Sequence, residues 1–556
     1  MLYRLAKCFP DLKGALLAIV SAILLVLAFP DFDYWFLAWF ALVPLMWAVE
    51  REGRVLSSFL IGWLFGTAFF CGTCWWLTYA PIHYASMPWP IAYFLILIAC
   101  LGAGIFPGIF ASVLSILIKR LGSWAFFAAP FVWVFSEFLR YWLTGNNWNA
   151  IGYSQAFTNS HLVTLASFGG TAFVGFLVVL PMSLLQAPIF SWGPFRDPAR
   201  FYQKVPVNDD EVLSSPIKPA AYISFIVFFS ILLSAFLFSA LLLFTAPAPI
   251  VSGAKTAAIV SVQPNVPMSG VDHRQLEQLR KHQFDLAEAE IEKIREQLSA
   301  DSYQLTAVRQ PITVILPESP MNFMYNDDRE FQQFVRDFTT RNNVSLIFNS
   351  AEPDAANGKY FNSAMLIGPD GKPVAQYDKI YLLPFGEAVP VPLESIVPAF
   401  VGNFSYGREY DILPVGDAKA GVMICFESHF GALSREYVRN GADVLIEMTN
   451  DGYLGPTPVL RQHLANAVFR AVETNRPVLR VTNVGITAYI NERGQVLDEA
   501  PTYQEATRVW SVSKSDGSQT FYVKYGDWFA WLSTMVTVIL LGLCVLRRRE
   551  AAVERG

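Results

Sequence analysis

Three residues with complementary chemistry stand at the ends of short apolar segments. Glu318 ends the segment VILPES, Lys379 follows AQYD, and Cys425 ends GVMIC. In α/β sheets, functional groups collect at the carboxyl ends of strands, where the chain turns outward. If these segments are strands, an acid, an amine and a thiol meet in one cleft.

Such a combination suits acyl transfer through a covalent intermediate. The thiolate is the nucleophilic form of a cysteine, and Glu318 can take the thiol proton and later give it to the leaving group. Lys379 and the backbone N–H groups after Cys425 can stabilise a tetrahedral oxyanion. Taken singly, each residue also has a structural explanation, as a small core cysteine, a strand-ending glutamate or a solvated lysine.

The segments that carry these residues predict an α/β domain over residues 248–526, because short apolar runs alternate with helical patterns. We expect helices at 271–299, 328–341, 430–440 and 459–475. We expect strands at 256–264, 311–319, 345–352, 361–369, 372–379, 421–428, 443–451, 478–485 and 486–494.

The composition of the whole chain argues against an all-soluble protein. Of the 556 residues, 53% are hydrophobic and only 16% are charged, and the mean hydropathy is +0.36. A membrane-spanning helix needs about 20 mostly apolar residues. We expect seven spans in residues 1–247 and an eighth in 527–556, at 12–29, 32–50, 55–79, 91–118, 123–142, 161–190, 219–247 and 527–546.

Basic residues predict the orientation of these spans. Lys and Arg lie before the first span, after the eighth, and between spans two and three, four and five, and six and seven. The alternate loops 30–31, 80–90 and 143–160 contain none. Because basic loops stay in the cytoplasm, we expect both termini there and residues 248–526 on the outer face.

Other features suggest less chemistry. Cys71 and Cys74 form a CxxC pair, but no second pair or histidine cluster accompanies it, so we interpret both as helix-packing residues. A net charge of -5 does not suggest nucleic-acid binding, and no metal or organic cofactor is predicted. His429 is disfavoured as a partner of Cys425, because a glutamate and a lysine already provide base and electrostatics. His463 is expected at the surface or behind the catalytic residues.

Four strings resemble the nitrilase superfamily in order and spacing: LPES (316–319), YDKIYLLPFGEAVP (377–390), GVMICFES (421–428) and NRPVLRVTNVGITAYI (475–490). They are most similar to its membrane-bound branch, the apolipoprotein N-acyltransferases. The string SEFLRYWLTGNNWNAIGYSQ (136–155) is similar to an external loop of that family. The resemblance covers nearly the whole chain and implies an αββα sandwich for the soluble domain.

The resemblance implies a role for each matching position. Glu318 would be the general base, Lys379 the oxyanion-stabilising amine and Cys425 the nucleophile. Glu387 would order Lys379 or assist proton transfer. Trp148 would lie near a lipid-facing entrance, although an interfacial anchor is an equally simple explanation.

Glu427 matches another acid of the family, but it can also be a structural charge that pairs with Arg435. Three positions depart from the family pattern. Phe426 stands where a tyrosine is common, and Tyr453 and Leu454 stand where an aromatic pair is usual. These departures bear on lipid preference more than on the type of reaction.

The implied reaction has two steps at the outer face of a bacterial inner membrane. A phospholipid gives an acyl chain to Cys425, and the thioester passes it to the N-terminal amine of an S-diacylglyceryl-cysteine apolipoprotein. One alternative is a membrane-tethered amidase that acts on a small amide. Another is a scaffold or transporter, which would predict more charged residues within the spans.

Overall fold

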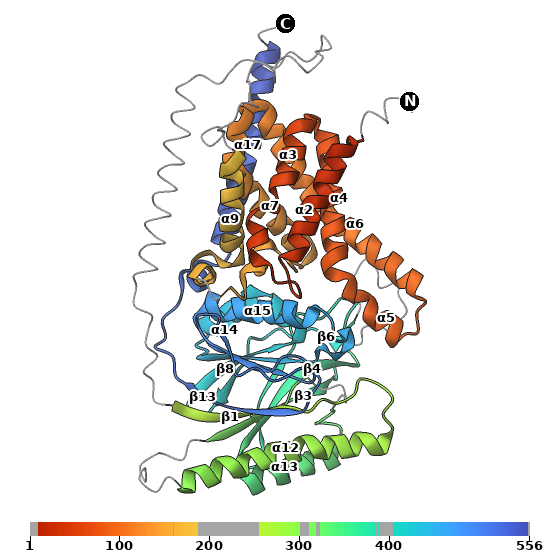
Figure 1. Cartoon of the computed structure of the whole chain (residues 1–556). Helices are drawn as coiled ribbons and strands as arrows, with labels where there is room; N and C mark the ends of the chain where they lie inside the picture. The colour runs from red at the N-terminus through yellow and green to blue at the C-terminus, as the bar shows by residue number, and fades with distance from the viewer. Residues whose placement is uncertain are drawn as a thin grey trace.

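The computed structural model describes most of the chain, namely residues 9–158, 161–186, 255–300, 311–318, 323–384, 386–389 and 404–553. A bundle of apolar helices lies against one end of an α/β domain (Figure 1). The expected seventh span at 219–247 and the loop at 191–218 lie outside the described residues.

The bundle is built from long apolar helices of the N-terminal part and one helix near the C-terminus. Four helical stretches among the described residues are long and apolar enough to cross a membrane: Val55–His83, Trp89–Thr144, Ala166–Gln186 and Trp528–Leu546. They contain the helices α4 (Val55–Cys74), α5 (Tyr79–His83), α6 (Trp89–Leu121), α7 (Ala129–Thr144), α9 (Ala166–Gln186) and α17 (Trp528–Val553). A shorter apolar helix, α2, spans Leu12–Leu27.

Helices α4 and α6 approach closely because small residues face each other. A Cβ atom on Gly66 would lie 2.8 Å from the ring of Pro107 and 2.9 Å from the Cα atom of Gly104. Close backbone approach through small residues is the usual packing of membrane helices, because van der Waals contact drives their association. Cys71 and Cys74 at the end of α4 are both free, as the helix-packing interpretation expects.

The expected second span at 32–50 is not one continuous helix. The segment forms a 3-10 helix at Trp35–Trp39 and then the ten-residue helix α3 at Val43–Glu52. Gly53 ends α3 in the left-handed conformation, with φ of 65°. Ten residues of helix rise about 15 Å, half of the hydrocarbon thickness, so α3 does not cross a bilayer by itself.

The α/β domain contains two sheets. The first has the order β13-β1-β2-β3-β4-β5, with β6 paired to β4. Its strands are β1 (Lys255–Gln263), β2 (Ile312–Ile315), β3 (Ser345–Asp354), β4 (Lys359–Ile367), β5 (Pro373–Asp378), β6 (Phe404–Ser405) and β13 (Ala506–Ser513). Parallel pairing joins β1, β2 and β3.

The second sheet has the order β12-β11-β10-β9-β8-β7. Its strands are β7 (Ile412–Val415), β8 (Ala418–Ile424), β9 (Val444–Thr449), β10 (Val478–Thr482), β11 (Ala488–Ile490) and β12 (Val496–Leu497). Strands β8, β9 and β10 pair in parallel. Every residue of β9 and β10 is buried, and so are six of the seven residues of β8, as is usual for parallel strands covered on both faces.

Two pairs of helices cover the domain (Figure 1). Helices α12 (His273–Ala300) and α13 (Arg329–Asn342) lie on the side away from the bundle, and α14 (Gly431–Arg439) and α15 (Val459–Thr474) lie between the second sheet and the bundle. Helix α15 is buried along nearly its whole length because it contacts strands on one side and helix α9 on the other. These helices lie within two residues of the expected ranges.

Candidate functional site

Cys425 lies where strand β8 ends and a 3-10 helix, Cys425–His429, begins. Its backbone is left-handed, with φ of 52°. A non-glycine residue in this region costs on the order of 1 kcal/mol or more and persists only where its surroundings hold it. The sharp turn directs the thiol out of the strand end, as the strand-end position predicted.

The carboxylate of Glu427 holds this turn. Its Oε2 accepts the N–H of Ile424 at 2.9 Å, and its Oε1 accepts the N–H groups of Ile380 at 2.7 Å and Tyr381 at 3.0 Å. The hydroxyl of Tyr377 donates to the same Oε1 at 2.7 Å. Glu427 therefore joins the nucleophile's turn to the segment that follows Lys379.

The alternative pairing of Glu427 with Arg435 is wrong. Nη1 of Arg435 lies 3.5 Å from Oδ2 of Asp527, at the start of α17. Burial raises the pKa of Glu427 to about 7, although Lys379 and the backbone donors favour its charged form. Four hydrogen-bond donors surround this carboxylate, so Glu427 has a structural role in the site. The spacing of the motif alone does not reveal that role.

Lys379 follows strand β5 and is almost fully buried, with 1% of its surface exposed. Its Nζ lies 2.8 Å from Oε1 of Glu387 and 3.7 Å from Oε1 of Glu318. Burial disfavours the ammonium, but the two carboxylates outweigh this effect and raise the pKa of Lys379. The lysine is therefore a fixed positive charge at the site.

Asn362 in strand β4 holds both carboxylates next to the lysine. Its Nδ2 donates to Oε1 of Glu387 at 2.7 Å and to Oε1 of Glu318 at 3.2 Å. Its own Oδ1 accepts from Asn349 at 2.6 Å. Sequence reasoning missed Asn362, because an asparagine within a strand pattern carries no chemical signature until the sheet places it beside the acids.

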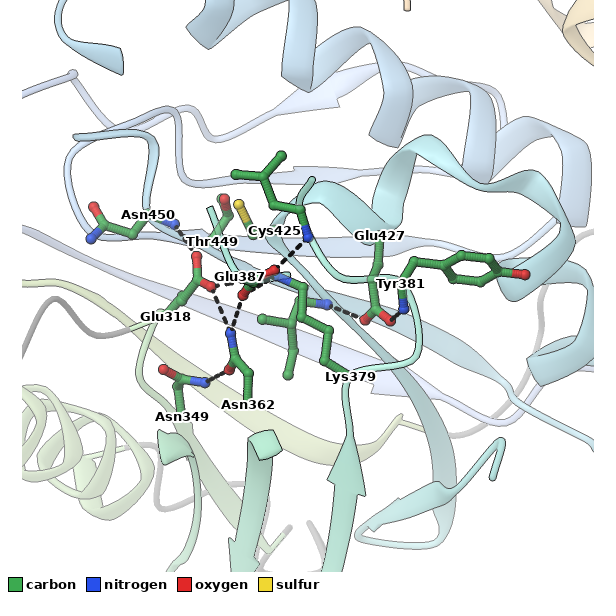
Figure 2. A network of polar contacts seen from close by, with 12 residues as sticks. Glu318, Asn349, Asn362, Lys379, Tyr381, Glu387, Cys425, Glu427, Thr449 and Asn450 are labelled. Atoms are coloured by element: carbon green, nitrogen blue, oxygen red, sulfur yellow. Dashed lines mark hydrogen bonds and ion pairs between the residues drawn. The ribbon is translucent and has the colours of Figure 1, made fainter. Parts of the chain in front are cut away.

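Glu318 follows strand β2 and faces the nucleophile (Figure 2). Its Oε2 accepts the N–H of Asn450 at 3.1 Å, and its charge acts on the thiol of Cys425. Burial raises the pKa of Glu318, with Lys379 opposing the shift and Glu387 adding to it. A carboxyl group whose pKa moves toward neutrality is suited to both taking and returning a proton.

The Cys425 thiol is predominantly protonated in this setting. Burial raises its pKa well above the ordinary value and the negative charge of Glu318 adds to the shift, while Lys379 opposes it. Reaction therefore requires a base beside the thiol, and Glu318 lies on that side (Figure 2). The structure thus brings together Glu318, Lys379 and Cys425, with Glu387 as the partner of the lysine.

His429 is not arranged as a base for Cys425. Its Nε2 accepts the backbone N–H of Asn147 at 2.7 Å. Burial and the nearby positive charge of Arg470 lower the pKa of His429 to about 3, so the ring is neutral. The ring of Phe426 stacks on His429 at 5.5 Å, so this departure from the family pattern contributes an apolar face.

Trp148 contacts the catalytic domain through the same histidine. Its indole stacks on His429 at a centroid distance of 5.6 Å. Its Nε1 donates to Oε1 of Gln462 in α15 at 3.0 Å. The tryptophan therefore lies in the contact between the bundle's loops and the catalytic domain, against a histidine four residues after the nucleophile.

Tyr453 and Leu454 lie on the 3-10 helix Asp451–Leu454, directly after Asn450. Tyr453 is 47% exposed and its ring lies 6.3 Å from that of Tyr84, in the loop before α6. The hydroxyl of Tyr84 donates to the carbonyl of Gly452 at 3.0 Å. This loop of the bundle therefore borders the site on the side of Glu318.

His463 is buried, and its predicted position behind the catalytic residues is correct, whereas a surface position is not. Its Nε2 lies 3.0 Å from the carbonyl oxygen of Cys425, and its Nδ1 lies 2.7 Å from Oδ1 of Asp451. Asp451 and its partner Arg480 were not singled out from the sequence. Both are charged residues buried in the core, and their burial is explained only by the ion pair that they form there.

Comparison with known proteins matches both parts of the chain. The family model for the apolipoprotein N-acyltransferase N-terminal domain matches residues 21–184, and the model for carbon-nitrogen hydrolases matches residues 293–520. A curated apolipoprotein N-acyltransferase from Geobacter metallireducens is 29% identical and aligns over 96% of each chain. That of Pasteurella multocida is 27% identical over 100% of each chain.

Among solved structures, an amidase of the nitrilase superfamily from Nesterenkonia is similar to half of this chain. It is 16% identical, covers 50% of this chain and 95% of its own length, and has a TM-score of 0.35. The curated acyltransferases align with both the helical and the α/β part. Over nearly its whole length the chain is similar to the apolipoprotein N-acyltransferases, and its α/β part matches the carbon-nitrogen hydrolases.

Proposed function

We propose that this chain is an apolipoprotein N-acyltransferase that moves an acyl chain from a phospholipid, through a thioester on Cys425, to the N-terminal amine of an S-diacylglyceryl-cysteine apolipoprotein. The observation that carries the proposal is the convergence of Glu318, Lys379 and Cys425 beneath the loops of an apolar helical bundle. Both substrates are anchored in lipid, so a catalytic cleft that acts on them must lie next to the membrane.

In the first step, Glu318 takes the proton of Cys425, and the thiolate attacks the carbonyl carbon of the phospholipid ester. The oxygen that gains charge is stabilised by the ammonium of Lys379 and the backbone N–H of Phe426. The tetrahedral intermediate collapses when the carbon–oxygen bond breaks and Glu318 returns the proton to the departing oxygen. The products are the Cys425 thioester and a lysophospholipid.

In the second step, the free amine of the apolipoprotein attacks the thioester carbonyl. Glu318 takes a proton from the attacking nitrogen, and the same oxyanion donors stabilise the second tetrahedral intermediate. Breaking the carbon–sulfur bond releases the amide, and the thiol regains its proton. Water must be kept from the thioester, and the loops that carry Trp148 and Tyr84 border the site where this exclusion is needed.

We assign the catalytic domain to the periplasmic side, residues 248–526, with the spans in 1–247 and 527–556, both termini in the cytoplasm and eight spans in total. The loops without basic residues supply the contacts to the catalytic domain: Gln462 bonds to the carbonyl of Pro30 and to the side chain of Trp148. Helix α17 runs from the domain to the far end of the bundle (Figure 1), and its last turns include the basic residues Arg547, Arg548 and Arg549. For the domain we propose the four-layer α-β-β-α arrangement.

The test is intact-protein mass spectrometry of purified protein after incubation with phospholipid. The wild type is compared with Cys425→Ala and Glu318→Gln, and with Cys71→Ala as a matched cysteine control. We expect a hydroxylamine-labile acyl adduct on the wild type and on Cys71→Ala, and none on the other two. Absence of an adduct on the wild type across several headgroups and chain lengths would overturn the phospholipid acyltransferase proposal.

A further inference from the structure

Four ionisable side chains form a cluster directly behind the nucleophile. We call Glu447, Asp451, His463 and Arg480 the buried ion quartet. Nη1 of Arg480 lies 2.5 Å from Oε2 of Glu447, and its Nη2 lies 2.8 Å from Oδ2 of Asp451. His463 contacts Asp451 through Nδ1 at 2.7 Å and Glu447 through Nε2 at 3.1 Å. All four are at most 4% exposed.

Charge balance within the quartet requires a protonated histidine. Two buried carboxylates and one arginine leave one negative charge without a partner, and an unpaired buried charge costs several kcal/mol. An imidazolium at His463 completes the balance and donates from both ring nitrogens. Burial opposes this charge, and so does Arg480, but Asp451 and Glu447 outweigh both and raise the pKa of His463 to about 9.

The second bond of the same histidine reaches the nucleophile's backbone. Nε2 of His463 lies 3.0 Å from the carbonyl oxygen of Cys425. That carbonyl belongs to the peptide unit whose N–H is on Phe426. Because a trans peptide is planar and its C=O and N–H point in opposite directions, a donor that fixes the carbonyl of Cys425 also fixes the direction of the Phe426 N–H.

A cation on the carbonyl does more than orient the peptide. A hydrogen bond from a charged donor is about twice as strong as a neutral one, and hydrogen-bonded groups in a low-dielectric interior polarise one another. Polarisation of the Cys425 carbonyl makes the N–H of Phe426 a stronger donor. The same bond also helps to hold Cys425 at its φ of 52°.

We propose that His463 is a positioning residue for acyl transfer: through the carbonyl of Cys425, it aligns and polarises the peptide whose N–H receives the oxyanion. The inference rests on the proposed acyl-transfer function and deepens it. The other groups that face the histidine are compatible with this assignment. The ring of Trp148, on the bundle side, lies 5.9 Å from that of His463 at an angle of 44° and carries no charge, and His429 is neutral.

The experiment compares two reactions of the same thiol. Acylation by a p-nitrophenyl ester or by a phospholipid passes through an oxyanion, whereas alkylation by iodoacetamide displaces iodide at a saturated carbon and forms none. Single-turnover rates of both reactions are measured for the wild type, His463→Gln and the exposed control His273→Gln. Thermal unfolding of each variant verifies folding.

We expect His463→Gln to lower the acylation rate by about 10- to 100-fold, approaching the loss of an oxyanion donor, while alkylation changes by less than about threefold. His273→Gln should match the wild type in both reactions. An equal fall in both rates would overturn the proposal, because the histidine would then act on the fold or the thiol in general. An unchanged acylation rate would overturn it too.

A second variant protects the test from a folding failure. In Asp451→Asn, Arg480 and Glu447 balance each other, so His463 no longer needs its charge and should lose its proton at a lower pH. We expect acylation to fall selectively in this variant and the fall to begin at lower pH than in the wild type. A pH profile identical to the wild type would count against the proposal.

The two acyl donors separate this inference from the proposed function. If phospholipid fails to acylate the wild type but the p-nitrophenyl ester succeeds, the phospholipid reaction is wrong, and the ratio of acylation to alkylation still tests His463. If each acyl donor reacts with His463→Gln as fast as with the wild type, the proposed function stands and the proposed role of His463 is wrong.

Discussion

The indole N–H of Trp148 in the helical bundle donates to Oε1 of Gln462 in the catalytic domain at 3.0 Å. The same oxygen accepts from Trp76 at 3.1 Å and from Asn149 at 3.3 Å. The amide nitrogen of Gln462 donates to the carbonyls of Pro30 and Thr73. One side chain, next in sequence to His463, thus joins three segments of the bundle to the helix behind the nucleophile.

Replacement of Gln462 by Ala should loosen this junction. The change removes the acceptor of the Trp148 indole N–H, which costs about 1–3 kcal/mol if that group finds no other partner. The Trp76 indole and the Asn149 amide lose one acceptor each but keep the carbonyl of Thr73 and the thiol of Cys74. We expect a lower unfolding temperature in detergent and faster proteolysis of the loops. Gln333→Ala, on the exposed face of α13, is the matched control. Equal unfolding temperatures for both variants would contradict the prediction.

Asn362 should be needed for acylation although it carries no charge. Asn362→Leu removes the donor shared by Glu318 and Glu387, so Lys379 alone then bridges the two carboxylates. We expect a fall of about 10- to 100-fold in the single-turnover acylation rate, of the size seen when a positioned proton-transfer group is disturbed. Asn491→Leu, in an exposed turn, serves as the control. A loss of less than about threefold would argue against a positioning role.

Glu427 and Arg435 should behave independently. Glu427→Gln replaces one carboxylate oxygen, an acceptor, by an amide NH₂ group, a donor. Four donors point at this carboxylate, so the substitution breaks hydrogen bonds that hold the turn carrying Cys425. We expect acylation to fall at least about 10-fold, which corresponds to 1.4 kcal/mol. Arg435→Ala removes a pair with Asp527 instead and should keep acylation within about threefold. Equal losses of acylation rate in the two variants would contradict this prediction and support a pairing of Glu427 with Arg435.

The charged state of His463 predicts a pH dependence of stability. Its pKa rises from 6.5 to about 9 on folding, which corresponds to roughly 3 kcal/mol at 1.36 kcal/mol per pKa unit. Between these pH values the folded protein binds more protons than the unfolded chain, so stability falls as pH rises. The contribution is fully present below pH 6.5 and is lost as pH passes through about 9.

Thermal unfolding of the wild type and His463→Gln across pH 6 to 10 measures this contribution. Other titrating groups act equally in both proteins, so the difference in unfolding temperature isolates the histidine. We expect the wild type to be more stable at pH 6 and the difference to shrink toward pH 10. A difference that does not change with pH would mean that His463 is not charged in the folded protein.

The proposed orientation can be tested by labelling in intact cells. Ser86→Cys lies in an exposed loop beside the catalytic domain, and Arg54→Cys lies in an exposed loop between α3 and α4. We expect a membrane-impermeant maleimide to label the first variant in intact cells and the second only after the membrane is opened. The unsubstituted chain sets the background of the native cysteines. The reverse pattern would invert the topology.

The amino-acid sequence alone predicts much of the catalytic domain, because the periodicity of apolar residues in strands and helices is a local property. Apolar runs such as GVMIC and VILPES predicted strand ends. The structure places these strands in different sheets, β8 in the second and β2 in the first, and brings their ends together, so Glu318 lies near Cys425. The segment 32–50 shows the limit of hydropathy. Its apolar content suits a span, but Pro44 near the start of α3 and Gly53 at its end confine the helix to ten residues.

The sequence by itself determined that an acid, an amine and a thiol stand at strand ends of an α/β domain attached to apolar helices, since residue type and periodicity need no partner to be read. Only the tertiary structure decided the groups that support them. Asn362 donates hydrogen bonds to two glutamates from different segments. Glu427 does not pair with Arg435 but accepts a hydrogen bond from Ile380, 47 residues away in the sequence. His463 contacts the carbonyl of Cys425, 38 residues away in the sequence. Such contacts depend on where distant segments pack, and buried charge is stable only where its partners converge.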